Sequence, residues 1–282
     1  MVRVGFPLWI GDRGNFEAKL KEAYEAGFDF IELSLDFPWP IPDSSTPNLI
    51  ARAMKEMGLD IALHGCWRDV KLASPISEVR EASVKYVVRI LDCCKALEPA
   101  YVVFHVSTDQ AVSEANEYEQ LIVDSAVKSV KEVVSYASKR GLEVVFENVP
   151  HQFCASLDQA VKLFRQVNGC KVCFDVGHAY AHSVRRNRNV DLYELVNSWL
   201  RELRDLIKCI HVYDCLVQGR WIDEHITPTT TSHPIKALIE ASRSWSFKPA
   251  FIVIEAFKNP DSGDAKPGDL VDVVELLKRE LR

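Results

Sequence analysis

The 282-residue sequence has no long apolar run, and none of its hydrophobic stretches approaches the roughly 18 residues that a membrane span needs. It also has no excess of basic residues, because 34 lysines and arginines face 40 aspartates and glutamates, for a formal net charge of -6. The first absence predicts that no membrane is a partner. The second argues against bulk binding of nucleic acid unless a local basic patch overrides it. Disorder is excluded for most of the chain, since 48% of the residues are hydrophobic.

No export signal is recognisable either, because residues 1–6 resemble a first strand and not a signal peptide. We therefore expect a cytoplasmic protein whose eight cysteines are mostly thiols. Cys170 and Cys173 form a CxxC pair, but no second CxxC is present to complete a zinc ribbon. Packing inside the fold is the expected role of Cys173, which lies in an apolar strand. Whether it pairs with Cys170 stays open.

Short apolar runs alternate with longer amphipathic ones along the chain. The short runs are rich in Val, Ile and Phe, which is typical of parallel strands buried on both faces. The predicted strands are Arg3–Phe6, Phe28–Leu35, Asp60–Leu63, Ala100–Val106, Leu142–Glu147, Lys171–Asp175, Cys209–Tyr213 and Ala250–Glu255. The predicted helices are Phe16–Ala26, Thr46–Met57, Ile76–Leu97, Glu114–Lys139, Ser156–Val167, Leu192–Ile207, Pro234–Ser242 and Asp269–Leu281. Gly27, Gly58 and Gly141 each follow a predicted helix, where a left-handed residue is expected.

Eight strands alternating with eight helices predict an α/β protein, a (β/α)8 TIM barrel, with residues 1–282 as a single domain. A doubly wound open sheet is the alternative, but the count of eight and the lack of a glycine-rich first turn favour the barrel. Three long segments, Phe37–Ser45, Ser183–Val190 and Leu216–His233, are expected to be irregular. All three follow strands, so a barrel would place them on its catalytic face.

Seven of the eight predicted strands carry an ionisable residue near their C-terminal end. These residues are Glu32, His64, His105, Glu147, Asp175, His211 and Glu255. In a barrel these ends share one face, so the side chains converge on one mouth. A single buried His or carboxylate is commonly satisfied by the backbone. Several acids in an apolar mouth repel one another unless a cation neutralises them. Because His with Asp or Glu is the ligand set of zinc and manganese, the pattern predicts a metal site.

Two local motifs extend this set. In Asp175-Val-Gly-His178 a second histidine lies just beyond the sixth strand, and Asp223-Glu-His225 follows the seventh. Alternation along an extended chain would point Asp223 and His225 the same way. Taken separately, each motif is equally compatible with a solvated loop. Together with the strand-end residues they offer more ligands than one metal takes, which suits two or three metals with a bridging carboxylate.

The segments that contain these residues resemble those of a known family of proteins. They are Ile61-Ala-Leu-His64, Val103-Phe-His105, Phe146-Glu147-Asn148, Phe174-Asp-Val-Gly-His178-Ala-Tyr, His211-Val-Tyr-Asp214, Asp223-Glu-His225 and Ile254-Glu255. In the order of these segments along the sequence, the chain resembles the xylose isomerase-like TIM barrel superfamily, and within it the endonuclease IV family.

The resemblance implies up to three zinc ions. It implies that His64, His105 and Glu147 hold the first ion, that Glu147, Asp175, His211 and Glu255 hold the second, and that His178, Asp223 and His225 hold the third. A zinc-bound hydroxide would then cleave DNA at abasic sites by attack on the phosphodiester. The chain departs from the family in its loops, with Asn148-Val-Pro-His-Gln-Phe153 and Thr227-Pro-Thr-Thr-Thr-Ser-His233 where glycine-rich stretches are usual.

Sugar or keto-acid isomerases and epimerases of the same superfamily are the alternative. They bind one divalent ion, such as Mn, Mg or Co, through a set that Glu147, Asp175, His211 and Glu255 fit. Glu147 and Glu255 would then move a proton beside a carbonyl group, and His178 would contact a small sugar or sugar phosphate. The hydrolase is the leading prediction because the isomerase leaves His64, His105, Asp223 and His225 without a role. A metal-binding barrel without activity is a third possibility.

The residues expected to contact the substrate lie on the same face. Trp67 stands where the family has a tyrosine, and Arg68 follows it. Ser183-Val-Arg-Arg-Asn-Arg188 is a basic loop, so Arg185, Arg186 and Arg188 are expected to bind DNA phosphates or a sugar phosphate, unless the loop is simply solvated. Trp39, Trp67 and Trp221 would supply stacking surfaces. Glu32 and Asp214 would orient metal ligands. Nothing in the sequence implies a protein partner.

Overall fold

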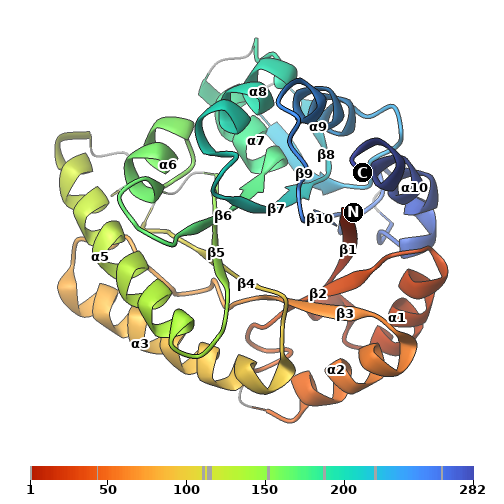
Figure 1. Ribbon diagram of the computed structural model, residues 1–282, viewed down its shortest axis with the longest axis horizontal. Coiled ribbons are helices and arrows are strands. Elements are labelled where there is room, and N and C mark those ends of the chain that lie inside the picture. The colour runs from red at the N-terminus through yellow and green to blue at the C-terminus, as the bar shows by residue number, and fades with distance from the viewer. Residues whose placement is uncertain are drawn as a thin grey trace.

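The computed structural model describes residues 2–42, 44–109, 112, 116–150, 153–186, 189–218, 221–261 and 263–282. Its parallel strands close into a barrel in the order β1-β10-β7-β6-β5-β4-β3-β2 (Figure 1). The barrel strands are β1 (Arg3–Leu8), β2 (Phe30–Ser34), β3 (Asp60–His64), β4 (Val102–His105), β5 (Val144–Glu147), β6 (Lys171–Asp175), β7 (Ile207–Val212) and β10 (Phe251–Ile254). The predicted (β/α)8 barrel is therefore confirmed.

Helices surround the strands and form the outer ring of the barrel (Figure 1). They are α1 (Phe16–Glu25), α2 (Thr46–Met57), α3 (Ser77–Cys94), α5 (Glu119–Ser138), α6 (Leu157–Phe164), α7 (Val176–Arg186), α8 (Leu192–Leu203), α9 (His233–Ser244) and α10 (Val271–Glu280). Short 3-10 turns lie at Ile10–Asp12, Lys95–Leu97, Asn116–Tyr118 and Pro267–Leu270. As predicted, Gly27, Gly58 and Gly141 have positive φ angles after their helices. No helix among the described residues is long and apolar enough to cross a membrane.

The apolar core has two layers, which explains why the strands are hydrophobic on both faces. The inner layer fills the barrel with side chains that include Phe30, Tyr101, Val145, Cys173 and Cys209. The outer layer lies between strands and helices and includes Cys170, directly before β6. The cysteines of the CxxC pair are therefore on opposite faces of the sheet, and both are free thiols. The predicted packing role of Cys173 agrees with its place in the inner layer.

Two of the segments expected to be irregular are partly regular. Residues 176–186 form α7, which directly follows β6, so Ser183, Arg185 and Arg186 belong to a helix and not to a loop. Residues 214–218 and 221–226 form the antiparallel hairpin strands β8 (Asp214–Gln218) and β9 (Trp221–Ile226). Ala181 and Val184 of α7 pack against Ile222 of the hairpin. This long-range contact stabilises both elements, and no periodicity within either segment revealed it.

Candidate metal centre

The ionisable residues predicted at the strand ends do lie together at the C-terminal mouth of the barrel. His64, His105, Glu147 and Asp175 are the last residues of β3, β4, β5 and β6. Their neighbours are Glu32 of β2, His211 of β7 and Glu255, which directly follows β10. All of these side chains are buried, with exposed fractions between 0 and 9%. Parallel strands in register place their ends at one level, so the barrel itself assembles the group.

His64, His105 and Glu147 form a first cluster. The Nε2 atoms of His64 and His105 lie 3.1 Å apart, and each lies 3.2 Å from Oε2 of Glu147. The Nδ1 atom of His64 contacts the carbonyl oxygen of Gly65 at 3.0 Å, which orients the ring and leaves Nε2 toward the cluster. Three ligand atoms that converge in this way are an arrangement that can hold a metal ion.

Glu147, Asp175, His211 and Glu255 form a second cluster. The Nδ1 atom of His211 lies 3.2 Å from Glu255 Oε2, 3.7 Å from Glu147 Oε1 and 3.9 Å from Asp175 Oδ2. These four atoms are buried and have no hydrogen-bond partner among the described residues. Buried polar atoms are nearly always paired, and a cation between these four would satisfy all of them at once. The donor set, one imidazole and three carboxylates, suits zinc or manganese.

Glu147 belongs to both clusters through different oxygens. Its Oε2 faces His64 and His105, whereas its Oε1 faces His178 at 3.0 Å and His211 at 3.7 Å. A carboxylate placed in this way can bridge two metal ions. The two clusters are therefore parts of one centre.

A third group contains His178, Glu224 and His225. His178 lies in the first turn of α7, where its backbone N–H donates to Asp175 Oδ1 at 2.6 Å and its Nδ1 donates to the Asn148 carbonyl at 3.0 Å. The structure does not bring the predicted ligand Asp223 into this group, because its carboxylate is paired with Lys258. His225 has a positive φ of 61°, so the alternation that would align Asp223 with His225 is broken. Glu224, which the sequence reasoning did not single out, takes that place.

The charges of the centre shift its titrations. Burial acts to raise the pKa of Glu147, but the neighbouring His105 and His211 outweigh it and hold that pKa well below its usual range. Burial acts to lower the pKa of His178, but Asp175 and Glu147 outweigh it and raise that pKa to about 10. Burial raises the pKa of Asp175 well above its usual range. Without a cation the carboxylates therefore stabilise the protonated form of His178, whereas burial lowers the pKa of His105 and of His225.

Two residues that the sequence reasoning missed hold the ligands in place. Tyr101 donates from its hydroxyl to Glu32 Oε2 at 2.8 Å, and Glu32 Oε1 in turn lies 3.1 Å from Nε2 of His211. Asn148 donates to the Asp175 carbonyl and accepts from the Asp175 N–H, both at 2.8 Å. The predicted orienting role of Glu32 fits this geometry. Asp214 instead accepts from Ser232 at 2.6 Å.

A cavity of about 230 Å³ opens above the centre. Its walls include the aromatic side chains of Trp9, Trp39, Trp67 and Phe257, and its lower part includes His64, His105, Glu147, His178 and Glu255. The volume is below the range of roughly 300–1,000 Å³ that is typical of sites for drug-sized ligands. The cavity therefore suits one small polar unit lying on the metal-ligand side chains.

The comparisons with known proteins agree with this architecture. Residues 20–279 match the family described as xylose isomerase-like TIM barrel. The chain belongs to the xylose isomerase-like TIM barrel family. The resemblance derived from the motifs is thereby confirmed.

Curated relatives of this family member carry an endonuclease name. A probable endonuclease 4 of Natranaerobius thermophilus is 26% identical and covers 92% of each chain, and one of Aquifex aeolicus is 24% identical over 75% of this chain and 77% of its own. Solved structures share the fold: a D-tagatose 3-epimerase-like protein has a TM-score of 0.74 at 18% identity, covering 99% of this chain and 97% of its own. D-psicose 3-epimerase of Clostridium cellulolyticum H10 has a TM-score of 0.73 at 14% identity, with 99% of each chain covered.

Only some of the residues of this xylose isomerase-like barrel that were expected to bind substrate are free to contact a ligand in the cavity. Trp67 lines the cavity and is 38% exposed, and the Arg68 guanidinium lies 4.3 Å from its ring. Arg68 is paired with Asp36, and Arg185 lies 3.4 Å from Glu224, so both guanidinium groups already have an acidic partner. Arg186 lies in the last turn of α7. Arg188 and the side chain of Trp221 lie outside the described residues.

Proposed function

We propose that the protein is a multinuclear metal-dependent phosphoester hydrolase. The observation that carries the proposal is the position of Glu147, whose two oxygens face separate groups of histidines. A one-metal enzyme has no use for this division, whereas hydrolases that act through neighbouring metals use a carboxylate to hold them together. The endonuclease 4 names of the curated relatives support the same class of reaction.

In this proposal His64, His105 and Glu147 hold one ion, and Glu147, Asp175, His211 and Glu255 hold a second. His178, His225 and Glu224 are the candidates for a third. Such ions, when bound, lower the pKa of water and offset the charge that develops on a phosphoryl oxygen. Zinc is the ion we expect first, because imidazole nitrogen and carboxylate oxygen are its ligands in hydrolytic enzymes.

The chain's own residues would position the substrate. Trp67 offers an aromatic surface at the rim, and the walls of the cavity exclude bulk water from the centre. His178 lies 3.0 Å from Glu147 and lines the same cavity, so it can hold a proton beside the reacting group. A sugar phosphate without a base fits the small cavity, which makes an abasic site in DNA the first substrate to test.

The test is cleavage of a duplex that contains one tetrahydrofuran abasic-site analogue, with bis(p-nitrophenyl) phosphate as a small phosphodiester assayed in parallel. Protein stripped by a chelator is reloaded with zinc, manganese or cobalt before the assay. We expect zinc-dependent hydrolysis that is lost in His105→Asn and retained in His233→Gln, which changes an exposed histidine at the start of α9. If neither phosphodiester is cleaved with any of these ions, the proposal is wrong.

A one-metal isomerase or epimerase is the second candidate, and a specific observation favours it. The cluster of Glu147, Asp175, His211 and Glu255 is complete by itself, and two of its carboxylates, Glu147 and Glu255, line the cavity and can exchange a proton with a carbon acid. The pairing of Arg68 and Arg185 with acids also agrees with a substrate that carries less charge than DNA.

Proton exchange distinguishes the two candidates. Metal-loaded protein is incubated in D2O with ketoses and ketose phosphates, and deuterium uptake beside the carbonyl carbon is followed by NMR. An isomerase incorporates deuterium and keeps this activity in His105→Asn, because the first cluster plays no part in it. A hydrolase incorporates none.

A further inference from the structure

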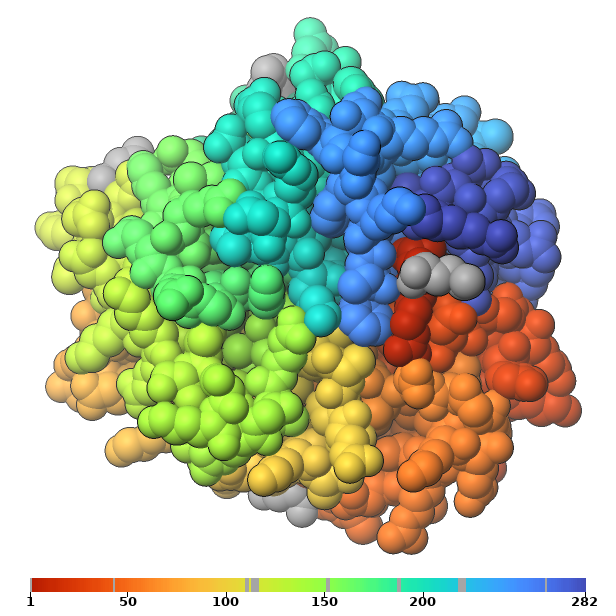
Figure 2. Space-filling view, viewed as in Figure 1, coloured from red at the N-terminus to blue at the C-terminus, as the bar shows by residue number. Residues whose placement is uncertain are grey.

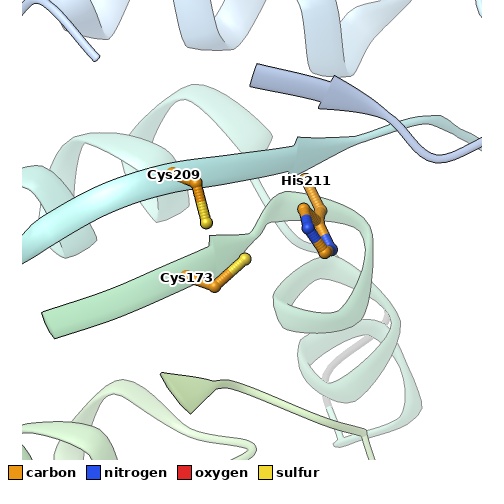
Figure 3. Close-up of side chains that lie close together, drawn as sticks. All are labelled: Cys173, Cys209 and His211. Atoms are coloured by element: carbon orange, nitrogen blue, oxygen red, sulfur yellow. The ribbon is translucent and has the colours of Figure 1, made fainter. Parts of the chain in front are cut away.

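The inner layer of the barrel contains a pair of thiols directly below the metal centre. Cys173 of β6 and Cys209 of β7 are register partners in neighbouring strands, and neither side chain is exposed. Figure 3 shows the two sulfur atoms in the space between these strands, with the His211 ring beside them. His211 comes two residues after Cys209 on β7, so both side chains face the barrel interior.

We propose that Cys173, Cys209 and His211 bind a thiophilic divalent ion of the zinc and cadmium class, at a site that shares only His211 with the carboxylate-rich centre above it. Their two Sγ atoms and one imidazole nitrogen lie within 4.8 Å of one another. Around one tetrahedral zinc ion such atoms lie roughly 3.5–3.8 Å apart, as follows from Zn–S and Zn–N bonds of about 2.3 and 2.0–2.1 Å. Small side-chain rotations close that difference.

The ligand types separate this site from its neighbour. Two sulfurs and an imidazole select soft or borderline ions, whereas the three carboxylates of the second cluster favour harder ones such as manganese or magnesium. His211 is the only member that the two groups have in common. His211 therefore belongs to two ligand sets, one that contains soft sulfur ligands and one that contains hard carboxylate ligands.

The surroundings favour a neutral complex at the lower site. The side chains packed around the two thiols include Phe30, Val145 and Val253, which are apolar. Two thiolates balance one divalent cation, so the bound state carries no net charge into this layer. Binding releases the two thiol protons to the solvent. Glu32 and Glu255, which both contact His211, line the cavity, so the shared histidine lies directly behind the cavity wall.

Sharing His211 couples the two sites. Its Nε2 faces Glu32 at 3.1 Å and its Nδ1 faces Glu255 at 3.2 Å, so the ring has a fixed orientation. An ion held by the thiols draws on the same ring, and its binding changes the affinity of the upper cluster for a hard ion.

Cadmium titration of the metal-free, full-length protein tests the site, with a thiol-free reductant present. Thiolate-to-cadmium charge transfer in the near ultraviolet reports sulfur ligation, which carboxylates and imidazoles do not give. We expect this absorption to saturate at one equivalent, to be lost in Cys173→Ser and Cys209→Ser, and to persist in Cys170→Ser, the matched buried cysteine on the opposite face of the sheet. It should also persist in His105→Asn, which changes a residue of the first cluster only.

The absence of charge-transfer absorption in the wild-type protein would overturn the proposal, as would absorption that survives in both serine variants. X-ray absorption of the cadmium-loaded protein distinguishes a shell of sulfur neighbours from one of oxygen and nitrogen alone, and the loss of that shell in Cys173→Ser and Cys209→Ser assigns the sulfurs to this pair. The site stands or falls independently of phosphoester hydrolysis, since the readout is ligation and not activity.

Discussion

The ring of His211 is held from one side by residues that belong to none of the metal-ligand clusters. Glu32 contacts its Nε2, and Tyr101 donates to Glu32, so the Nδ1 atom is left free toward the second cluster. A carboxylate behind a ligating histidine fixes the tautomer and raises the basicity of the ligand, and loss of such a partner costs about 10–100-fold in metal affinity. We expect Glu32→Gln to weaken metal binding by that factor, measured by competition with a chromophoric chelator.

The Tyr101→Phe substitution tests the same series of contacts, Tyr101 to Glu32 to His211, one residue further from the metal. The substitution keeps the ring that packs against Phe30 and Phe251 and removes only the hydroxyl group. We expect a smaller loss of metal affinity than in Glu32→Gln, since the glutamate keeps its contact with His211. Equal affinity in Glu32→Gln and wild type would contradict the orienting role.

The second prediction about single residues concerns Glu224, the acid beside His178. Glu224 lies in the group with His178 and His225, whereas Asp223 is paired with Lys258. If a third metal ion binds, Glu224→Gln should lose one equivalent of zinc in mass spectrometry of the native protein. Asp223→Asn, the matched control one residue away, should keep it. The opposite pattern would show that Asp223 is the ligand, as the alternation in the sequence predicted.

At the scale of elements, α7 reaches the centre because it packs very closely against Tyr213, the residue that follows β7. A Cβ atom at Gly177 would overlap the ring of Tyr213, which is fully buried. The Tyr213 ring in turn lies 4.2 Å from the ring of His225 and 6.0 Å from that of His178. The position of α7 and the position of the third group are therefore linked through one aromatic side chain.

Gly177→Ala should consequently disturb both stability and the site. Overpacking a filled interior costs typically about 1–3 kcal/mol, and here the tyrosine has to move to relieve it. We expect a lower free energy of unfolding by that amount in urea denaturation, together with weaker metal binding at His178 and His225. Gly14→Ala is the control, because a Cβ there meets no atom within 4 Å. If the Gly177→Ala protein were as stable as the Gly14→Ala protein, the Tyr213 ring would be able to move aside without a cost in stability.

For the whole molecule, the concentration of buried acids in one mouth makes folding depend on the cation. A ligand that binds only the folded state at about 100 times its Kd adds roughly 2.7 kcal/mol of stability. For a chain of this size each kcal/mol corresponds to about 2–4 °C in Tm. We therefore expect chelation to lower Tm by about 5–10 °C, and zinc or manganese to restore it. Identical melting curves with chelator and with metal would argue against a metal bound at this centre.

The fold was predictable because its determinants are local. The short apolar runs, the amphipathic segments between them and Gly27, Gly58 and Gly141 are patterns within a few residues of one another. The helix α7 and the hairpin β8–β9 were missed because neither is stable by itself. Ala181, Val184 and Ile222 support one another only when the barrel has brought them together.

The sequence by itself determined the closed barrel and the gathering of His64, His105, Glu147, Asp175, His211 and Glu255 at one mouth, because parallel strands of a barrel all end on the same face. Only the tertiary structure decided how these side chains divide into clusters. It assigned the two oxygens of Glu147 to different histidines, set Glu224 beside His178 and placed Tyr101 and Glu32 behind His211. The physical reason is that ligand geometry depends on distances between atoms from different strands, which spacing along one chain does not specify.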